Sequence, residues 1–301
     1  MNRIIGKRKG KADGTLVLLV AGVHGNEAES IEAVERVFKK IDDDKLIVNG
    51  EIVGVRGNIN AIEQGERYID YDLNRCFTFQ HLNYLRSDNA RFNKAEDYEA
   101  LELIQILDNY AKQPYDLKLL VDLHTTSAAQ GSFVIVPEFY AQHPVVESLE
   151  IPVIVNLENF LKGTLSMHSC DEGFLGMAFE GGQIGSREAV DLHEAGIWMM
   201  LQVSGILEGL ASSFVEKCQS LLHRQAEELP TKVKVKSMHM VHEGSGFKMN
   251  PGYYNFRKVN IGEVLARDKG GDIVAPQEGL IFMPLYQNQG SDGFFIVESL
   301  G

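Results

Sequence analysis

Cysteine and basic charge are both scarce in this chain. Its 301 residues include only three cysteines, Cys76, Cys170 and Cys218. These are too few and too scattered for a disulfide framework or a four-thiolate zinc site. The 29 Lys and Arg residues are outnumbered by 42 Asp and Glu, which gives a formal net charge of -13. This excess of acid argues against a surface that binds nucleic acid or an anionic membrane.

Long apolar runs are missing as well. No run approaches the roughly 20 residues that a membrane-spanning helix needs. The first 14 residues are basic and lack the apolar segment of a signal peptide. We therefore expect a cytoplasmic protein. Hydrophobic residues still make up 44% of the chain, enough for a sizeable core in one large domain or one domain plus a small one.

The apolar residues come in short runs separated by amphipathic stretches. Helices are predicted over 26–40, 95–113 and 186–210, and buried strands over 15–22, 51–57, 117–124, 132–137, 151–155 and 175–182. Strands that are almost entirely apolar and alternate with helices are typical of a sheet covered on both faces. The predicted fold class is therefore α/β, with a mixed, largely parallel sheet covered by helices on both faces.

The pattern changes after "EELP" at 227–230. Residues 231–301 hold short β-like runs broken by Gly, Pro and Asn, and no stretch there predicts a helix. We expect one domain over 1–230 and a small β-rich C-terminal domain over 231–301, with the boundary near Pro230.

A histidine and a glutamate follow the first predicted strand, in "AGVHGNEAES" at 21–30. His24 and Glu27 stand just past this strand, His124 closes the strand at 117–124, and Glu180 ends "LGMAFE". The carboxyl ends of parallel strands share one edge, where α/β sheets build ligand sites. His24 and Glu27 could chelate one zinc ion across a tight turn, with His124 as third ligand. Alternatively, Glu27 could only interact with the dipole of the following helix.

A charged stretch, "GERYIDYDLNRCF" at 65–77, contains few apolar residues. It includes Arg67, Asp70, Asp72, Asn74 and Arg75. An Asn–Arg pair suits the planar, bidentate capture of a carboxylate. The alternative is an ordinary surface loop in which Asp and Arg neutralise one another.

Together these motifs resemble the aspartoacylase and succinylglutamate desuccinylase family, within the zinc carboxypeptidase-like superfamily. The order is H-G-N-E, then R-Y-I-D-Y-D-L-N-R, then D-L-H-T-T, then a strand-terminal Glu before Gly-Gly. The resemblance runs from about residue 15 to 185 and looks continued by the C-terminal β region. It implies that His24, Glu27 and His124 hold one zinc ion per chain and that Glu180 is the catalytic carboxylate.

The resemblance also implies roles for residues outside the metal cluster. Asn74 and Arg75 would bind the α-carboxylate of the substrate's amino-acid half, and Arg67 would reach the scissile carbonyl. Asp72 would orient the first zinc-binding histidine, as such histidines usually require. Tyr286 would supply a further substrate contact.

These roles describe a zinc-dependent amidohydrolase acting on a small N-acyl amino acid. Zinc can polarise an amide carbonyl and activate a water. Glu180 would take the proton of that water and deliver it to the leaving amine, while Arg67 would help to stabilise the oxyanion. The expected partner is an acylated amino acid or a short peptide, and neither nucleic acid nor a membrane is expected to bind. The sequence is compatible with either a monomer or a homo-oligomer.

Two other functions use the same residues. A metallocarboxypeptidase acting on peptides would need the same zinc site and the same Asn–Arg pair. A non-catalytic zinc-binding protein would use the C-terminal domain for association. Glu180 argues against the second function, because pure binding needs no proton shuttle.

The sequence departs from the family at one position. Aspartoacylase-like enzymes use a further arginine about ten residues before the catalytic glutamate, to help bind an acidic substrate. No arginine lies between Gly163 and Glu180 here; Cys170 stands near that place, with His168 close by. We therefore predict that neutral or apolar acylated amino acids are preferred over N-acetylaspartate and N-succinylglutamate.

Overall fold

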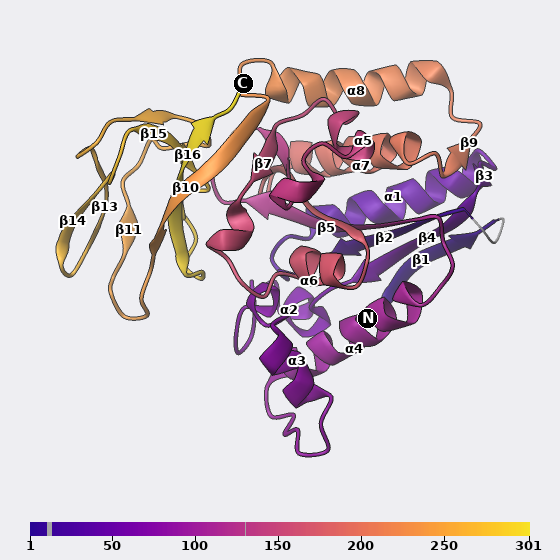
Figure 1. Cartoon of the computed structure of the whole chain (residues 1–301), viewed down its shortest axis with the longest axis horizontal. Coiled ribbons are helices and arrows are strands. Elements are labelled where there is room, and N and C mark those ends of the chain that lie inside the picture. Colours follow the sequence, from indigo (N-terminus) through magenta and orange to yellow (C-terminus); the bar gives the residue numbers. More distant parts are fainter. Residues whose placement is uncertain (11–13, 130) are drawn as a thin grey trace.

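The computed structural model describes residues 1–10, 14–129 and 131–301 (Figure 1). The basic N-terminal stretch considered above extends into 11–13, which lie outside the described residues. Eleven of the described strands form one sheet. In spatial order they are β1 (Ile4–Lys9), β4 (Gly50–Arg56), β2 (Thr15–Ala21), β5 (Leu117–Thr126), β8 (Leu175–Gln183), β6 (Ser132–Ile135), β7 (Val153–Val155), β10 (Lys232–Met240), β16 (Asp292–Ser299), β15 (Gly279–Phe282) and β12 (Lys258–Val259).

The centre of this sheet is parallel. Strands β4, β2, β5 and β8 all run in the same direction, whereas β1 joins β4 and β6 joins β8 in antiparallel fashion. The carboxyl ends of β2, β5 and β8 therefore meet at one edge, as the predicted site requires.

Helices cover both faces of the sheet (Figure 1). On one face lie α1 (Glu29–Asp43), α7 (Arg187–Val203) and α8 (Ser212–Ala226), and on the other lies α4 (Ala95–Ala111). Alternate side chains of β2 point to opposite faces of the sheet. Val17 and Leu19 pack against the layer of α1 and α7, and Leu16 and Leu18 pack against the layer of α4. Each apolar side chain buried in this way contributes about 1.5–3 kcal/mol, which explains the nearly continuous apolar run of this strand.

Several element boundaries differ from the prediction. Helix α1 begins at Glu29 rather than at residue 26, because Glu27 closes a turn by donating its N–H to the His24 carbonyl at 3.1 Å. The helix predicted over 186–210 ends at Val203, since Gly205 adopts a left-handed backbone with φ +70°. Strand β1 and helix α8 were not predicted.

Shorter elements complete the described part of the chain. They are α2 (Ile59–Gln64), α3 (Phe79–Leu85), α5 (Pro144–Glu147), α6 (Leu165–Asp171), the 3₁₀ turns Leu73–Arg75, Glu138–Tyr140 and Leu157–Asn159, and the strand pair β3 (Ile47–Val48) and β9 (Leu207–Glu208).

The C-terminal region is β-rich, as predicted, and continues the main sheet. Strand β10 runs parallel to β7, with Lys232 opposite Val153, and antiparallel to β16. A second small sheet contains β11 (Lys248–Met249), β13 (Val264–Asp268) and β14 (Gly271–Val274). The fold class is thus confirmed, while the domain boundary near Pro230 stays a prediction.

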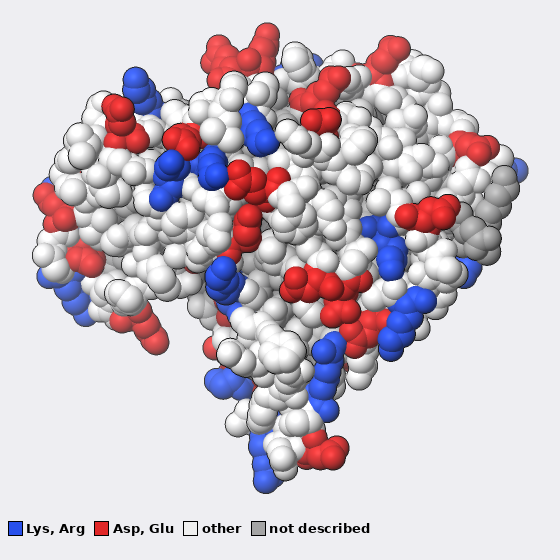
Figure 2. Space-filling model, viewed as in Figure 1, with Lys and Arg blue, Asp and Glu red and all other residues white. Residues whose placement is uncertain are grey.

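Side chains of both charges are scattered over the face drawn in Figure 2, with neither sign forming one continuous patch there. Among the described helices, none combines the length and the apolar character needed to span a membrane.

Candidate metal and catalytic site

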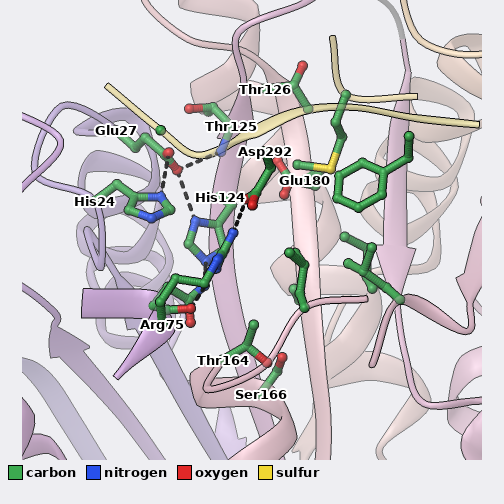
Figure 3. A pocket seen from close by; sticks show the side chains of 18 of the residues that line it. His24, Glu27, Arg75, His124, Thr125, Thr126, Thr164, Ser166, Glu180 and Asp292 are labelled. Atoms are coloured by element: carbon green, nitrogen blue, oxygen red, sulfur yellow. Dashed lines mark hydrogen bonds and ion pairs between the residues drawn. The ribbon is translucent and has the colours of Figure 1, made fainter. Parts of the chain in front are cut away.

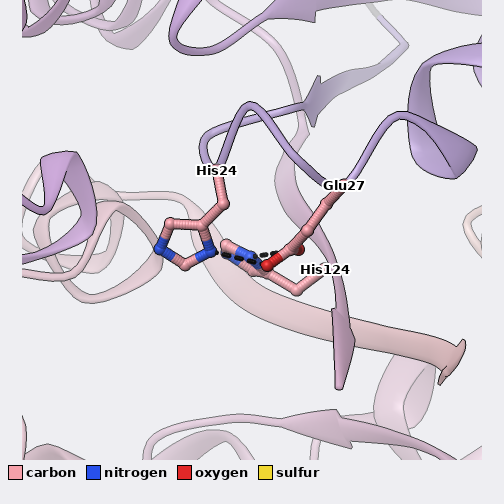
Figure 4. A group of neighbouring side chains, drawn as sticks. All are labelled: His24, Glu27 and His124. Atoms are coloured by element: carbon pink, nitrogen blue, oxygen red, sulfur yellow. Dashed lines mark hydrogen bonds and ion pairs between the residues drawn. The ribbon is translucent and has the colours of Figure 1, made fainter. Parts of the chain in front are cut away.

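Three potential metal ligands converge at the carboxyl edge of the parallel strands (Figure 4). His24 and Glu27 lie in the loop between β2 and α1, and His124 lies near the end of β5. One ligand atom from each lies within 4.8 Å of the others, and the three residues are 2–4% exposed. The three residues thus lie together, as the strand order in the sequence predicted, and they could hold a metal ion.

The carboxylate of Glu27 lies between the two imidazoles. Its Oε1 is 2.8 Å from Nδ1 of His24, and its Oε2 is 3.1 Å from Nδ1 of His124. Burial opposes ionisation, yet the two neighbouring histidines lower the pKa of Glu27 far below its usual value. Two imidazoles and an ionised carboxylate are a ligand set that zinc accepts, and three protein ligands leave a position for water.

Each histidine also contacts a second carboxylate through the ring nitrogen that does not face Glu27. Nε2 of His24 is 3.1 Å from Asp72 Oδ1, and Nε2 of His124 is 3.0 Å from Asp122 Oδ2. Both rings therefore direct Nδ1 toward Glu27, an arrangement that usually fixes the tautomer of a metal-ligating histidine. Asp72 was predicted, but Asp122 was missed. The signal was present in "DLH", because residues two apart on a strand share one face.

The glycine of the HGNE motif lets this loop pass close to α2. A Cβ atom at Gly25 would lie 2.1 Å from the backbone carbon of Ala61. The N–H of Gly25 also donates to the carbonyl of Arg67 at 3.1 Å, which joins the first motif to the second. Only glycine leaves room for this approach.

Glu180 lies beside His124 on the neighbouring strand. The two residues are paired in the parallel register of β5 and β8. Glu180 is 3% exposed, and its Oε2 has no hydrogen-bond partner within the described residues. Burial, reinforced by the charges of Glu27 and Asp122, raises the pKa of Glu180 to about 8. A carboxyl with such a pKa can hold a proton and exchange it near neutral pH.

The glycine after Glu180 makes room for a buried histidine from α7. A Cβ atom at Gly181 would lie 2.3 Å from Nδ1 of His193. Nε2 of His193 lies 3.0 Å from the carbonyl oxygen of His124. Sequence reasoning missed this residue, which packs behind the strand end that carries a candidate ligand.

The second motif brings its arginine to the metal cluster. The guanidinium of Arg67 is 3.5 Å from Glu27 and 3.2 Å from Asp72. Asn74 accepts a hydrogen bond from the N–H of Leu165 at 2.8 Å, and its Nδ2 is 3.1 Å from His124 Nε2. Both residues therefore border the cluster; the contacts with substrate that the family resemblance implied for them stay predictions.

His24, Glu27, Arg67, Asn74, Arg75, His124 and Glu180 line one pocket (Figure 3). The lining also includes apolar side chains, among them Ile135, Val136, Leu157, Leu161, Met167 and Leu285.

A family model for the succinylglutamate desuccinylase/aspartoacylase catalytic domain matches residues 13–189. The chain belongs to this family.

Individual relatives agree with this assignment. A probable aspartoacylase from Prochlorococcus marinus is 35% identical over 56% of this chain and 50% of its own length. A succinylglutamate desuccinylase from Pseudomonas aeruginosa is 34% identical over 46% of this chain and 38% of its own length. The matched part thus spans half or less of these relatives. A solved succinylglutamate desuccinylase/aspartoacylase structure from Rhodobacter sphaeroides shares the fold, with a TM-score of 0.66, 18% identity, and coverage of 98% of this chain and 88% of that one.

Two sequence features of this desuccinylase/aspartoacylase family member lie outside the pocket. His168, which stands near the place of the missing arginine, is buried and stacks on Phe77 with ring centroids 6.3 Å apart. The hydroxyl of Tyr286 donates to the Asn250 carbonyl at 2.8 Å and accepts from the N–H of Tyr253 at 3.0 Å. Neither His168 nor Tyr286 is among the described residues that line the pocket. The substrate contact predicted for Tyr286 stays a prediction.

A buried glutamate on α4 holds the second motif in place. Glu96 is fully buried and accepts hydrogen bonds from the backbone N–H groups of Ile69 at 2.7 Å, Asp70 at 2.9 Å and Tyr71 at 3.3 Å. It also accepts from the side chain of Asn58 at 3.0 Å. The loop that carries Arg67 to Arg75 is thus fixed by one carboxylate, which sequence reasoning missed.

A segment of the C-terminal region crosses the site in this family member. Residues 284–292, here called the strap, lie against the loops of all three motifs. The side chain of Gln287 accepts from Asn26 at 3.3 Å, that of Gln289 accepts from the N–H of Arg67 at 3.1 Å, and the carbonyl of Pro284 accepts from Ser127 at 3.1 Å. The strap ends at Asp292, whose carboxylate pairs with the guanidinium of Arg75.

Proposed function

We propose that this protein is a zinc-dependent hydrolase that cleaves the amide bond of a small N-acyl amino acid. The observation that carries the proposal is the position of Glu180. A buried carboxyl with an unpartnered oxygen lies beside a His–Glu–His cluster and lines the same pocket. Binding alone would not need this group, whereas hydrolysis needs a residue that accepts and returns a proton.

Zinc would be held by His24, Glu27 and His124. When bound, it supplies a Lewis acid that polarises the amide carbonyl and activates water. The convergence of two Nδ1 atoms on one ionised carboxylate supports this assignment. Asp72 and Asp122 would hold the histidines in the tautomer that leaves Nδ1 free to bind the metal.

Glu180 acts as the proton shuttle in this proposal. It takes a proton from the attacking water while oxygen bonds to the carbonyl carbon, and it returns that proton to nitrogen as the C–N bond breaks. The products are a carboxylic acid and a free amine. Its raised pKa, about 8, supports the return of the proton near neutral pH.

Two arginines would bind the substrate. Nε of Arg67 is buried and has no hydrogen-bond partner in the described part of the chain, so it can donate to the carbonyl oxygen as negative charge develops there. Arg75, together with Asn74, would bind the α-carboxylate of the amino-acid half.

The lining of the pocket favours substrates that carry a single carboxylate. It includes several aliphatic side chains, and His168 contacts Phe77 instead of lining the pocket. A second carboxylate, on the amino-acid side chain as in N-acetylaspartate or on the acyl group as in N-succinylglutamate, would have to be desolvated there without a cationic partner among the described lining residues.

The experiment is an assay of released amine over N-acyl amino acids and dipeptides, with zinc removed by a chelator and then restored. We expect zinc-dependent turnover of acylated amino acids with apolar side chains or acyl groups. Turnover restricted to dipeptides would indicate the metallocarboxypeptidase instead. No turnover of either class by the zinc-loaded protein would contradict the proposal.

A further inference from the structure

The guanidinium that is expected to bind the substrate's carboxylate already has a partner. Nη2 of Arg75 pairs with Oδ2 of Asp292, and Nη1 of Arg75 donates to the carbonyl of Asn74 at 2.5 Å. The arginine and aspartate side chains are 23% and 17% exposed, and both line the pocket. Figure 3 shows the two side chains pointing toward each other beside His124.

The strap fixes the position of Asp292. The residue stands at the start of β16, where it is paired with Met240 of β10, and its Oδ1 accepts from the hydroxyl of Ser291 at 3.3 Å. Upstream, Gln287 and Gln289 bind the loops of the first two motifs. The carboxylate therefore belongs to the wall of the pocket.

The pairing leaves the pocket without an unpartnered fixed cation. Among the described residues that line it, only Arg67 and Arg75 carry a permanent positive charge. Arg67 is paired with Glu27 and Asp72, and Arg75 with Asp292. A substrate carboxylate that binds the Nη2 side of Arg75 competes with a carboxylate that the protein itself supplies, and like charges brought together there repel each other.

We propose that Asp292 is a specificity-determining residue that competes with the substrate's α-carboxylate for Arg75. A substrate with one carboxylate binds by displacing Asp292 from the guanidinium. A substrate with two carboxylates is disfavoured, because the second one meets no cation and faces the displaced Asp292. This inference rests on the proposed deacylase function and names the charge class of its substrate as monoanionic.

The test compares Asp292→Asn with Glu298→Gln. Glu298 lies on the same strand, is exposed and pairs with Lys236 at 3.0 Å, so its replacement removes the same charge outside the pocket. Each protein is assayed with N-acetylleucine, its C-terminal amide and N-acetylaspartate. In Asp292→Asn we expect KM to fall about tenfold for N-acetylleucine, to fall further for N-acetylaspartate, whose second carboxylate no longer faces an anion, and to stay within about twofold for the amide. In Glu298→Gln we expect all three KM values to match those of the wild type.

Equal KM changes for acid and amide in Asp292→Asn, or equal changes for N-acetylleucine and N-acetylaspartate, would overturn the inference. A wild-type protein that hydrolyses none of the three substrates would count against the proposed function instead. Binding is therefore also measured by calorimetry in zinc-loaded Glu180→Gln, with and without Asp292→Asn, so that affinity for the carboxylate is read without turnover. We expect N-acetylleucine, but not its amide, to bind about tenfold more tightly to the double variant. If Asp292→Asn does not fold, Asp292→Ser replaces it with the same expected outcome.

Discussion

Replacing Glu96 with glutamine should loosen the loop that carries the substrate-binding arginines. Oε2 of Glu96 accepts from the N–H groups of Asp70 and Tyr71, and Oε1 accepts from Ile69 N–H and Asn58. A glutamine retains one oxygen, so two of these four donors lose their acceptor in either orientation of the amide.

The expected magnitude follows from those two donors. A fully buried donor without an acceptor costs about 1–3 kcal/mol; because the backbone donors here are only partly buried, Glu96→Gln should lower the free energy of unfolding by about 1–3 kcal/mol in total. The loop would shift with Arg67, Asn74 and Arg75, and a displacement near 1 Å costs up to roughly a hundredfold in rate. We therefore expect kcat/KM to fall by roughly tenfold to a hundredfold, and zinc affinity to fall as well, because Asp72, which orients His24, lies on this loop.

The assays are urea unfolding, kcat/KM for a preferred acylated amino acid, and zinc per chain by elemental analysis. Glu102→Gln is the matched control. Glu102 lies on the same helix, is 58% exposed and pairs with Arg3, so its loss should change stability by less than about 1 kcal/mol. Stability and kcat/KM equal to the wild type in Glu96→Gln would refute the positioning role.

Three further predictions concern the metal, acid stability and packing. Asp122→Asn removes the carboxylate behind His124, so zinc affinity in a chelator competition should fall roughly 10–100-fold. Burial opposes ionisation of Glu51, but hydrogen bonds from Lys7, Tyr115 and Tyr110 outweigh burial and lower the pKa of Glu51 to about 2. The ionised carboxylate therefore stabilises the fold above pH 4.5, the ordinary pKa of the group, and this stabilisation is lost as the pH falls toward 2. The difference in urea midpoint between the wild type and Glu51→Gln should accordingly disappear between pH 4.5 and pH 2. Gly25→Ala should lower the thermal midpoint and zinc content together, because its Cβ would meet the backbone of α2.

Much of the site follows from strand order. His24, His124 and Glu180 each stand at or just beyond the carboxyl end of a strand, and β2, β5 and β8 are parallel neighbours. Once an α/β sheet was predicted, their convergence at one edge was expected. Asp122 could have been found by the same reasoning, because the period of a strand places it on the face of His124.

The rest of the site depends on tertiary packing. Asp292 meets Arg75 across 217 positions of sequence, through a strap whose path is set by Gln287 and Gln289. No local periodicity predicts such a contact. Glu96 lies at the start of α4, where an acidic residue is already expected because it interacts favourably with the helix dipole. The sequence therefore gives no separate sign that Glu96 also binds the backbone of the second motif.

The proposed function depends on Glu180 as the group that accepts and returns the proton, and the Glu180→Gln variant tests this role most directly. Glu180→Gln preserves the shape of the side chain and removes the group that accepts the proton. Turnover of the preferred acylated amino acid and zinc content should be measured on the same preparation. We expect about one zinc per chain, as in the wild type, with turnover lower by roughly 10² or more. Zinc-loaded Glu180→Gln with turnover close to that of the wild type would contradict this role.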